Sequence, residues 1–454
     1  MSDRAKRDGA ERNTFARRLK RYANVTTSVG GAAARIAGSR ALRIGSDEKA
    51  QAADLKAALG GVKGPIMKVA QLLASIPEAL PASFAAELST LQTNAPPMGW
   101  PFVKRRMSVE LGPAWEARFK SFERDAAAAA SLGQVHCAVS LKGEPLACKL
   151  QYPDMASAVE ADLAQLKLIF SIYRRMDRAI DPSEMADEIG DRLREELDYE
   201  REAAHIKLYR KVLAERPVVH VPRVIDELST ARLLTMSWEA GKPILDFKAH
   251  SLEERNTIAK HLFQAWWHPF SHYGVIHGDP HLGNYSVREN LELNLLDYGC
   301  IRAFKPSFVR GVIDLYRAME ANDRDMAVHA YETWGFKGLK SEVIDTLNIW
   351  ARFIYAPLLD HRVRTIADGI EPGAYGRKEA FEVHKRLSQL GPVKPPREFV
   401  FMDRAAIGLG GVFLHLAAEL NFYELFNAEI ANFDLKRVAK DQAAAFKAAG
   451  VPLP

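Results

Sequence analysis

Hydrophobic positions in the first quarter of the chain recur at intervals of three and four residues. The spacing is clearest at residues 53–59 and 66–76, and it is typical of helices that bury one face. The pattern is interrupted at Pro77, Pro81, Pro96, Pro97 and Pro101. Proline lacks the amide hydrogen that continues a helix, so these positions predict turns. The sequence therefore predicts a helical segment over residues 46–115.

A mixed pattern follows over residues 116–240. Short alternating segments predict strands at 134–140, 144–153 and 232–238. The first two are joined at Lys142-Gly143, a typical turn pair. Helical spacing returns at 155–177 and 182–215. Strands followed by long helices predict an α+β domain here.

The chain becomes mostly helical again over residues 241–454. Its longest apolar run, 405–418, is interrupted by three glycines and His415. It is too short and too interrupted to span a bilayer, so we expect a buried helix. No apolar segment follows the first charged residues, so a signal peptide is not expected.

Composition narrows the class of protein. A chain of 454 residues predicts two or three domains. Three cysteines argue against a disulfide framework and favour a reducing compartment, so we expect a cytoplasmic location. A net charge of +5 is too small to indicate nucleic-acid binding.

Residues 1–45 form a basic arm. Its positive charges are Arg4, Lys6, Arg7, Arg12, Arg17, Arg18, Lys20 and Arg21, followed by more arginines. Such an arm is usually solvated and partly disordered. The alternative is a peripheral contact with anionic lipid, to which each basic residue near the surface contributes about 1 kcal/mol. The acids at Asp3, Asp8 and Glu11 argue against a transit peptide.

Candidate chemistry is concentrated in two neighbouring segments. The stretch IHGDPHLGN at 276–284 contains Asp279 and Asn284, and LLDYG places Asp297 thirteen residues after Asn284. Mg²⁺ prefers oxygen ligands from one or two carboxylates together with substrate phosphates. A further carboxylate can orient or deprotonate an attacking hydroxyl. The spacing matches the catalytic loop and metal loop of kinases.

Upstream segments match the remaining parts of a kinase. The glycine-loop frame falls on Ala128, Ala129, Ala130, Ser131, Gly133 and Val135, with alanine at its first two glycine positions. LACK ends in Lys149, on a predicted strand fourteen residues after Val135. The segment EELDYEREA supplies Glu196, Asp198 and Glu202, of which one glutamate is expected to steady the lysine.

Each of these features has an ordinary explanation by itself. A strand lysine or a glutamate-rich helix is usually solvated, and an alanine run is usually helical. A single HGD is most often a loop with a capping aspartate. Their occurrence together, in the order and spacing of a kinase, is far more specific.

In four motifs the sequence resembles the UbiB/ADCK family of atypical protein-kinase-like proteins. MKVAQLL resembles its KxGQ motif and supplies Lys68 and Gln71, with Ala70 in place of glycine. AAASLGQVH resembles its alanine-rich nucleotide loop, and ELDYEREA its ExD motif. HGDPHLGN and LLDYG resemble its catalytic and metal loops. Ser237 follows Met236 where the family's hinge would have glutamate.

The resemblance implies an α+β, two-lobed protein-kinase-like fold with a helical N-terminal extension over the active site. It divides the chain into the arm at 1–45, the extension at 46–115, an N-lobe at 116–240 and a helical C-lobe at 241–454. It also implies use of ATP and Mg²⁺ in support of isoprenoid-quinone or related lipid biosynthesis. Lipids, quinone precursors and a peripheral membrane surface become candidate partners. Protein kinase activity on other proteins is not expected.

The resemblance also assigns roles to residues. Lys149 would hold the α- and β-phosphates, Glu202 would orient Lys149, and Asp279 would act as base or position the nucleophile. Asn284 and Asp297 would bind Mg²⁺, and Met236 would lie beside the adenine. A gate over the γ-phosphate would be formed by Lys68, Gln71, Glu196 and Asp198.

Two other classes stay open. A small-molecule phosphotransferase of the aminoglycoside or choline kinase type also has H-x-D and D-x-x loops, but the Lys68 motif and the long insert before Glu196 argue against it. A nucleotide-binding pseudoenzyme that acts as a scaffold is the other. The intact set of Asp279, Asn284 and Asp297 argues against that class.

Overall fold

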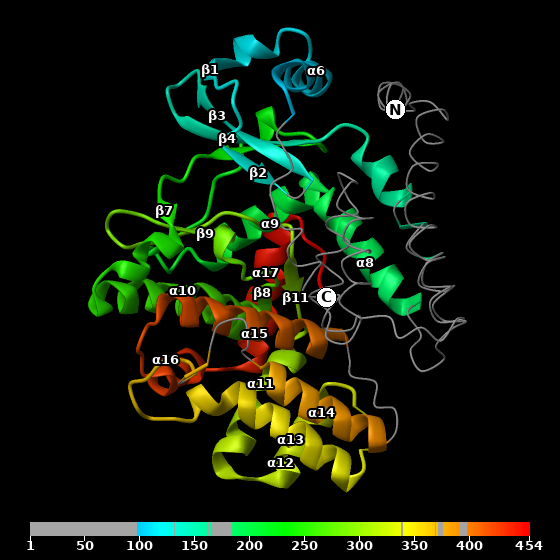
Figure 1. The fold of residues 1–454 in the computed structure, drawn as a ribbon, viewed down its shortest axis with the longest axis vertical. Coiled ribbons are helices and arrows are strands. Elements are labelled where there is room, and N and C mark those ends of the chain that lie inside the picture. Colours follow the sequence, from blue (N-terminus) through cyan, green and yellow to red (C-terminus); the bar gives the residue numbers. More distant parts are fainter. Residues whose placement is uncertain are drawn as a thin grey trace, which may run out of the picture. The chain divides into compact units, whose positions relative to one another are not determined.

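The computed structural model describes most of the chain from residue 98 onward (Figure 1). The described residues are 98–130, 132–161, 163–164, 167, 183–336, 339–367, 369–370, 376–390 and 397–454. They form two compact units. The first holds described residues up to Glu200 together with Val224–Trp238, and the second holds Arg201–Arg223 and Glu239–Pro454. The predicted basic arm and most of the predicted helical extension lie outside the described residues.

The first unit is built on an antiparallel sheet. Its strands are β1 (Phe119–Phe122), β2 (Ala128–Ala130), β3 (Gly133–Ser140), β4 (Pro145–Gln151) and β6 (Leu233–Ser237). They pair in the order β1-β3-β4-β6, and β2 pairs with the first residues of β3. The three strands predicted from the alternating segments are thus confirmed. The β3–β4 turn contains Gly143 at φ 86°, a conformation that favours glycine.

The alanine run forms a strand, so the helical interpretation of it is wrong. Ala128 pairs with Val135 and Ala130 with Gly133 in the β2–β3 hairpin. The amide of Ala127 also donates to the carbonyl of Val135 at 2.8 Å. Alanine favours helix only weakly per residue. Here the backbone hydrogen bonds to β3 override that preference.

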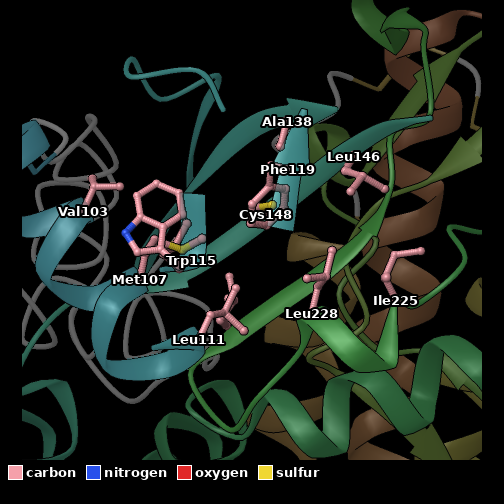
Figure 2. Close-up of a cluster of buried hydrophobic side chains, with 12 residues drawn as sticks. Val103, Met107, Leu111, Trp115, Phe119, Ala138, Leu146, Cys148, Ile225 and Leu228 are labelled. Carbon is pink, nitrogen blue, oxygen red and sulfur yellow. The ribbon is translucent and has the colours of Figure 1, made fainter. Parts of the chain in front are cut away.

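One face of the sheet packs on α6 (Trp100–Leu111) through a buried apolar cluster (Figure 2). Its members are Val103, Met107, Leu111, Trp115, Phe119, Ala138, Leu146, Cys148, Leu150, Ile225, Leu228 and Leu233. The rings of Trp115 and Phe122 meet edge to face with centroids 5.1 Å apart, a geometry that contributes about 0.5–1.5 kcal/mol beyond burial. Successive strand residues point to opposite faces. The cluster therefore leaves Ala147 and Lys149 of β4 on the other face.

The segment 182–215, predicted as one helix, is broken in two. α8 (Ser183–Glu196) and α9 (Tyr199–Val212) are separated at Leu197-Asp198. Two i→i−3 hydrogen bonds, from the amides of Leu197 and Asp198, tighten the end of α8. Nε2 of Gln151 on β4 donates to the carbonyl of Leu197 at 3.0 Å. This bond from another element satisfies a helix-end carbonyl and holds the break in place.

The second unit is mainly helical (Figure 1). Its helices are α9 from Arg201 onward, α10 (Leu252–Tyr273), α11 (Pro306–Ala321), α12 (Arg324–Thr333), α13 (Ser341–Tyr355), α14 (Arg377–Leu390), α15 (Arg397–Leu416), α16 (Phe422–Ile430) and α17 (Leu435–Ala449). α10 begins with a capping box between Ser251 and Glu254 and ends at Gly274, which adopts φ 64°. Both signals are local in sequence.

Two small sheets carry the loops of the candidate site. One has the order β5 (Val219–His220), β10 (Leu293–Leu295), β9 (Tyr285–Val287) and β7 (Lys242–Pro243). In the other sheet, β8 (Val275–His277) pairs antiparallel with β11 (Ile301–Ala303). The pairs β5–β10, β7–β9 and β8–β11 join segments that are distant in sequence, whereas β9 and β10 are neighbours in the chain.

The apolar run at 405–418 lies mostly within α15, as predicted. Ala405, Leu409, Val412, Phe413 and Leu416 of this helix are buried. Gly408 of the run lets Pro280 approach the helix closely. Within the described part of the chain, every helix falls short of the length and apolarity needed to cross a membrane.

Asp403 of α15 is an acid in apolar surroundings. Its carboxyl lines a cavity of about 30 Å³ with rings such as Trp334, Trp350 and Tyr331. Nε1 of Trp350 donates to its Oδ2 at 2.5 Å. Although the residue is half-buried as a whole, its carboxyl group is enclosed, and this burial raises the pKa to about 8. The folded protein therefore holds a neutral Asp403 at neutral pH.

The sign of the resulting pH dependence follows from proton linkage. The folded state keeps the Asp403 proton up to about pH 8, whereas the unfolded chain releases it near pH 4. Between these limits stability should fall as pH rises, by up to about 1.4 kcal/mol per pH unit. Asp403→Asn should flatten that slope in urea unfolding between pH 5 and 8. The exposed Asp246→Asn is the control, and equal slopes in all three proteins would contradict the burial of the acid.

Candidate functional site

The face of the first sheet opposite the apolar cluster carries a row of predicted nucleotide-binding residues. Strand register pairs Ala128 with Val135, and Val135 with Lys149. Residues directly opposite in antiparallel strands project from the same face. Ala128, Val135 and Lys149 therefore share one face, opposite the apolar cluster. Three of the residues assigned from the sequence to the nucleotide are brought together by this pairing.

Alternation along each strand extends the row. Ala130 and Gly133 lie two residues from Ala128 and Val135, so they belong to the same face. On β6, Met236 is paired with Ala147, two residues from Lys149, and joins them. Ala129 alternates to the opposite face, so its contribution to a nucleotide site would come from its backbone. Ser131 lies outside the described residues.

Lys149 lies against an aromatic ring that sequence reasoning missed. The residue is only 9% exposed, and its ammonium lies 5.4 Å from the ring centroid of Tyr199. A cation over an aromatic face gains about 0.5–2 kcal/mol. Tyr199 is the one aromatic residue in EELDYEREA. It is only 2% exposed, so its ring is part of the packing around Lys149 and not of a solvated helix face. An aromatic residue inside a glutamate-rich segment was the available signal.

The acidic segment divides at the break between α8 and α9. Glu196 ends α8 and is half-buried, whereas Asp198 is exposed in the break. Glu202 lies in α9 and is only 2% exposed. Because Lys149 belongs to the first unit and Glu202 to the second, their pairing stays a prediction. The gate stays one too, since Lys68 and Gln71 lie outside the described residues.

The catalytic loop begins where β8 ends, at His277. Its turn is closed by the amide of His281, which donates to the carbonyl of Asp279 at 2.8 Å. The Nδ2 of Asn284 donates to the same carbonyl at 2.9 Å. This bond assigns the amide orientation and leaves Oδ1 of Asn284 as its ligand atom for a hard cation. Asp279 and Asn284 are thus held together, as their spacing predicted.

The metal loop is tied directly to the catalytic loop. Nε2 of His277 donates to the backbone carbonyl of Asp297 at 2.5 Å. The amide of Leu296 donates to the carbonyl of Asn284 at 3.1 Å. Within the metal loop, the amide of Gly299 donates to Oδ1 of Asp297 at 2.9 Å. Two hydrogen bonds therefore join the loops that carry Asp297 and Asn284, and the third orients the Asp297 carboxylate within its own loop.

His277 links the catalytic loop to the metal loop, and aromatic rings surround it. Tyr209, Tyr285 and Tyr298 lie with ring centroids 6.2–6.4 Å from it. Nε2 donates to a carbonyl, and Nδ1 has no hydrogen-bond partner among the described residues. Burial, and then the charge of Asp279, raise the pKa of Tyr285 far above its usual value. The Tyr285 phenol therefore stays protonated.

The donors present fit Mg²⁺. An amide oxygen and a carboxylate on adjoining loops are the hard oxygen ligands it prefers, with substrate phosphates completing the shell. Asp279 is exposed beside them and can face a substrate hydroxyl or water. The arrangement is chemically suited to phosphoryl transfer.

A helix contact also positions the catalytic loop. A Cβ atom added at Gly408 of α15 would lie 2.8 Å from Cγ of Pro280. No side chain larger than hydrogen fits there without moving one of them. Gly408 belongs to no motif of the sequence, because its partner Pro280 lies 128 residues away in the chain.

Gly408→Ala should displace Pro280 and with it Asp279. A misplacement of about 1 Å at a reacting group can lower a rate by on the order of 100-fold, so we expect at least a tenfold loss of ATP turnover. Gly411→Ala, three residues along the same helix, meets nothing within 4 Å and should keep turnover. Initial rates of phosphate release compare the two variants. Equal rates would show that the catalytic loop does not depend on this contact.

This geometry defines a kinase-like site, and comparison with known proteins identifies the family. Residues 90–331 match the ABC1 atypical kinase-like domain. That match covers just over half of the 454 residues. The chain therefore belongs to the ABC1 atypical kinase-like family, and the resemblance to UbiB/ADCK proteins is confirmed.

Several named relatives are similar over part of their length. The atypical kinase COQ8 of Saccharomyces cerevisiae mitochondria is 27% identical over 284 residues, covering 62% of this chain and 57% of COQ8. The probable serine/threonine-protein kinase abkA of Dictyostelium discoideum is 31% identical over 265 residues, covering 55% of this chain and 46% of that one. The chain thus spans about half the length of these curated relatives.

A solved structure supports the fold. The complex of Rv3197 with erythromycin from Mycobacterium tuberculosis matches with a TM-score of 0.58 and 26% identity. The match covers 82% of this chain and 93% of that chain. The kinase-like α+β fold predicted from the sequence is confirmed.

Proposed function

We propose that this protein is an ATP- and Mg²⁺-dependent atypical kinase or ATPase that supports isoprenoid-quinone, such as ubiquinone, or related lipid biosynthesis. The main support for this activity is a pair of hydrogen bonds, one from Asn284 to Asp279 and one from His277 to Asp297. It holds a candidate base and two metal ligands on adjoining loops. Similarity to COQ8 proteins carries the link to quinones.

Roles follow from the contacts of each side chain. Lys149, steadied over Tyr199, would neutralise the α- and β-phosphates, and Glu202 would orient it. Asn284 and Asp297 would hold Mg²⁺, which supplies charge neutralisation at the β- and γ-phosphates when bound. Asp279 would accept a proton from a hydroxyl or a water molecule.

The acceptor is proposed to be a lipid or quinone precursor, or water, and not a protein. In this proposal Lys68, Gln71, Glu196 and Asp198 gate the γ-phosphate and exclude peptide hydroxyls. The basic arm at 1–45 would bring a cytoplasmic protein to an anionic membrane surface. A small-molecule phosphotransferase is the second candidate, favoured by the likeness to a chain solved with erythromycin.

Phosphate release from Mg²⁺-ATP tests the proposal. Wild type should release phosphate, and Asp279→Asn should not. Vesicles with increasing anionic lipid should raise the rate if a membrane surface is the partner. Transfer of labelled phosphate to erythromycin or to an aminoglycoside would favour the second candidate. Nucleotide binding without any release or transfer would overturn both and indicate a scaffold.

A further inference from the structure

A cluster of metal-ligating side chains lies at the end of α10, apart from the catalytic residues. His268 and His272 are one helical turn apart, so they share a face of α10. Glu429 reaches them from α16. One ligand atom from each of the three residues lies within 4.8 Å of the other two. Nδ1 of His268 is 3.5 Å from Oε2 of Glu429.

The two imidazoles present electron pairs to this cluster. Ser271 Oγ donates to the carbonyl of Trp267 at 2.8 Å. It can therefore accept from Nδ1 of His272, also at 2.8 Å, which leaves the unprotonated Nε2 of His272 as its ligand atom. Nδ1 of His268 accepts from Arg216 at 3.1 Å. His268 is only 4% exposed, and its Nε2 has no hydrogen-bond partner in the part of the chain that the structure describes.

Neutral imidazole and ionised carboxylate are the forms that bind metals. The contacts above leave one acceptor nitrogen on each of the two rings, Nδ1 of His268 and Nε2 of His272.

A cation already occupies part of this position. Nη2 of Arg216 lies 3.1 and 3.2 Å from the two carboxylate oxygens of Glu429. The same nitrogen contacts Nδ1 of His268, so the guanidinium covers two of the three ligands. The Arg216 side chain keeps 31% of its surface exposed. Solvent therefore reaches the guanidinium side of this contact.

We propose that His268, His272 and Glu429 bind one divalent transition-metal ion of the Zn²⁺ type, in competition with Arg216. Two imidazole nitrogens, one carboxylate and a water molecule form a common tetrahedral set for Zn²⁺. The donors differ from the all-oxygen set of Asn284 and Asp297, which suits Mg²⁺. The metal would join α16 to the end of α10. That end leads through β8 into the catalytic loop.

Zn²⁺ titration of the full, untagged chain tests this site after chelator treatment and without nucleotide. Wild type should bind one equivalent and gain thermal stability. His272→Ala and Glu429→Gln should each weaken binding at least tenfold. Arg216→Gln should tighten it at least threefold, because the competing charge is gone. Circular dichroism checks folding, and His272→Gln replaces His272→Ala if that variant is unstable.

A matched control is available just before the N-terminus of α10. His250 lies one turn from Glu254 and 3.3 Å from its Oε1, but this pair has no second histidine. His250→Ala should keep the full equivalent of Zn²⁺, and so should Asp297→Asn. Equal affinity in wild type, His272→Ala and Glu429→Gln would overturn the site. Absence of binding in both wild type and Arg216→Gln would overturn it as well, and unchanged affinity in Arg216→Gln alone would overturn the competition.

Discussion

Asp297→Asn is expected to abolish Mg²⁺-dependent nucleotide binding while the protein stays folded. The change removes one ligand charge from the proposed metal site. Loss of a residue that merely supports a ligand typically costs about 10- to 100-fold in metal affinity, so loss of a ligand should cost at least about 100-fold. The asparagine Oδ1 can still accept from the Gly299 amide, and the backbone bond from His277 is unaffected.

Thermal shifts measure this effect. Wild type should be stabilised by ATP with Mg²⁺, and Asp297→Asn should show the same melting temperature with and without both. Asp246→Asn makes the same chemical change at an exposed position in the same unit and should behave as wild type. Undiminished stabilisation of Asp297→Asn by Mg²⁺-ATP would refute the assignment of this residue to the metal.

The catalytic and metal loops could be predicted because their information is local. Asp279 and Asn284 lie within one short loop, and a five-residue separation is enough to bring them together. Asp297 follows a strand whose pairing with β9 is also short in sequence. Residue types and spacing were therefore enough to predict that these two loops lie next to each other. The strands around Lys149 were predictable for the same reason.

Contacts between distant segments were not accessible in this way. The helix break at Leu197 depends on Gln151, 46 residues earlier, and the helical pattern itself continues across it. Tyr199 and Gly408 likewise gain their roles from Lys149 and Pro280 on other elements. Periodicity reports which face of an element is buried, but not which element covers it.

Gly133→Ala should cause the largest loss in the first unit. A Cβ atom at this position would lie 2.3 Å from the carbonyl oxygen of Leu150 and 2.9 Å from the hydroxyl of Tyr199. The first contact is with backbone that pairs β3 to β4, so it cannot relax without shifting that register. Overpacking of this kind costs about 1–3 kcal/mol or more. The row from Ala128 to Lys149 would be displaced, and ATP affinity should fall at least tenfold.

Ala128→Gly on the facing strand separates a role in nucleotide binding from a role in packing. Ala128 is exposed, so loss of its methyl group should lower the free energy of unfolding by only about 1 kcal/mol or less. The change should nevertheless alter ATP affinity, because the methyl group belongs to the row of predicted nucleotide-binding residues. Urea unfolding and ATP titration measure both quantities in each variant. Adding Tyr199→Phe to Gly133→Ala removes the weaker contact only, so it should not restore stability. Full rescue by that second change would place the clash at Tyr199, and wild-type behaviour of Gly133→Ala would show that β3 and β4 are not packed as described.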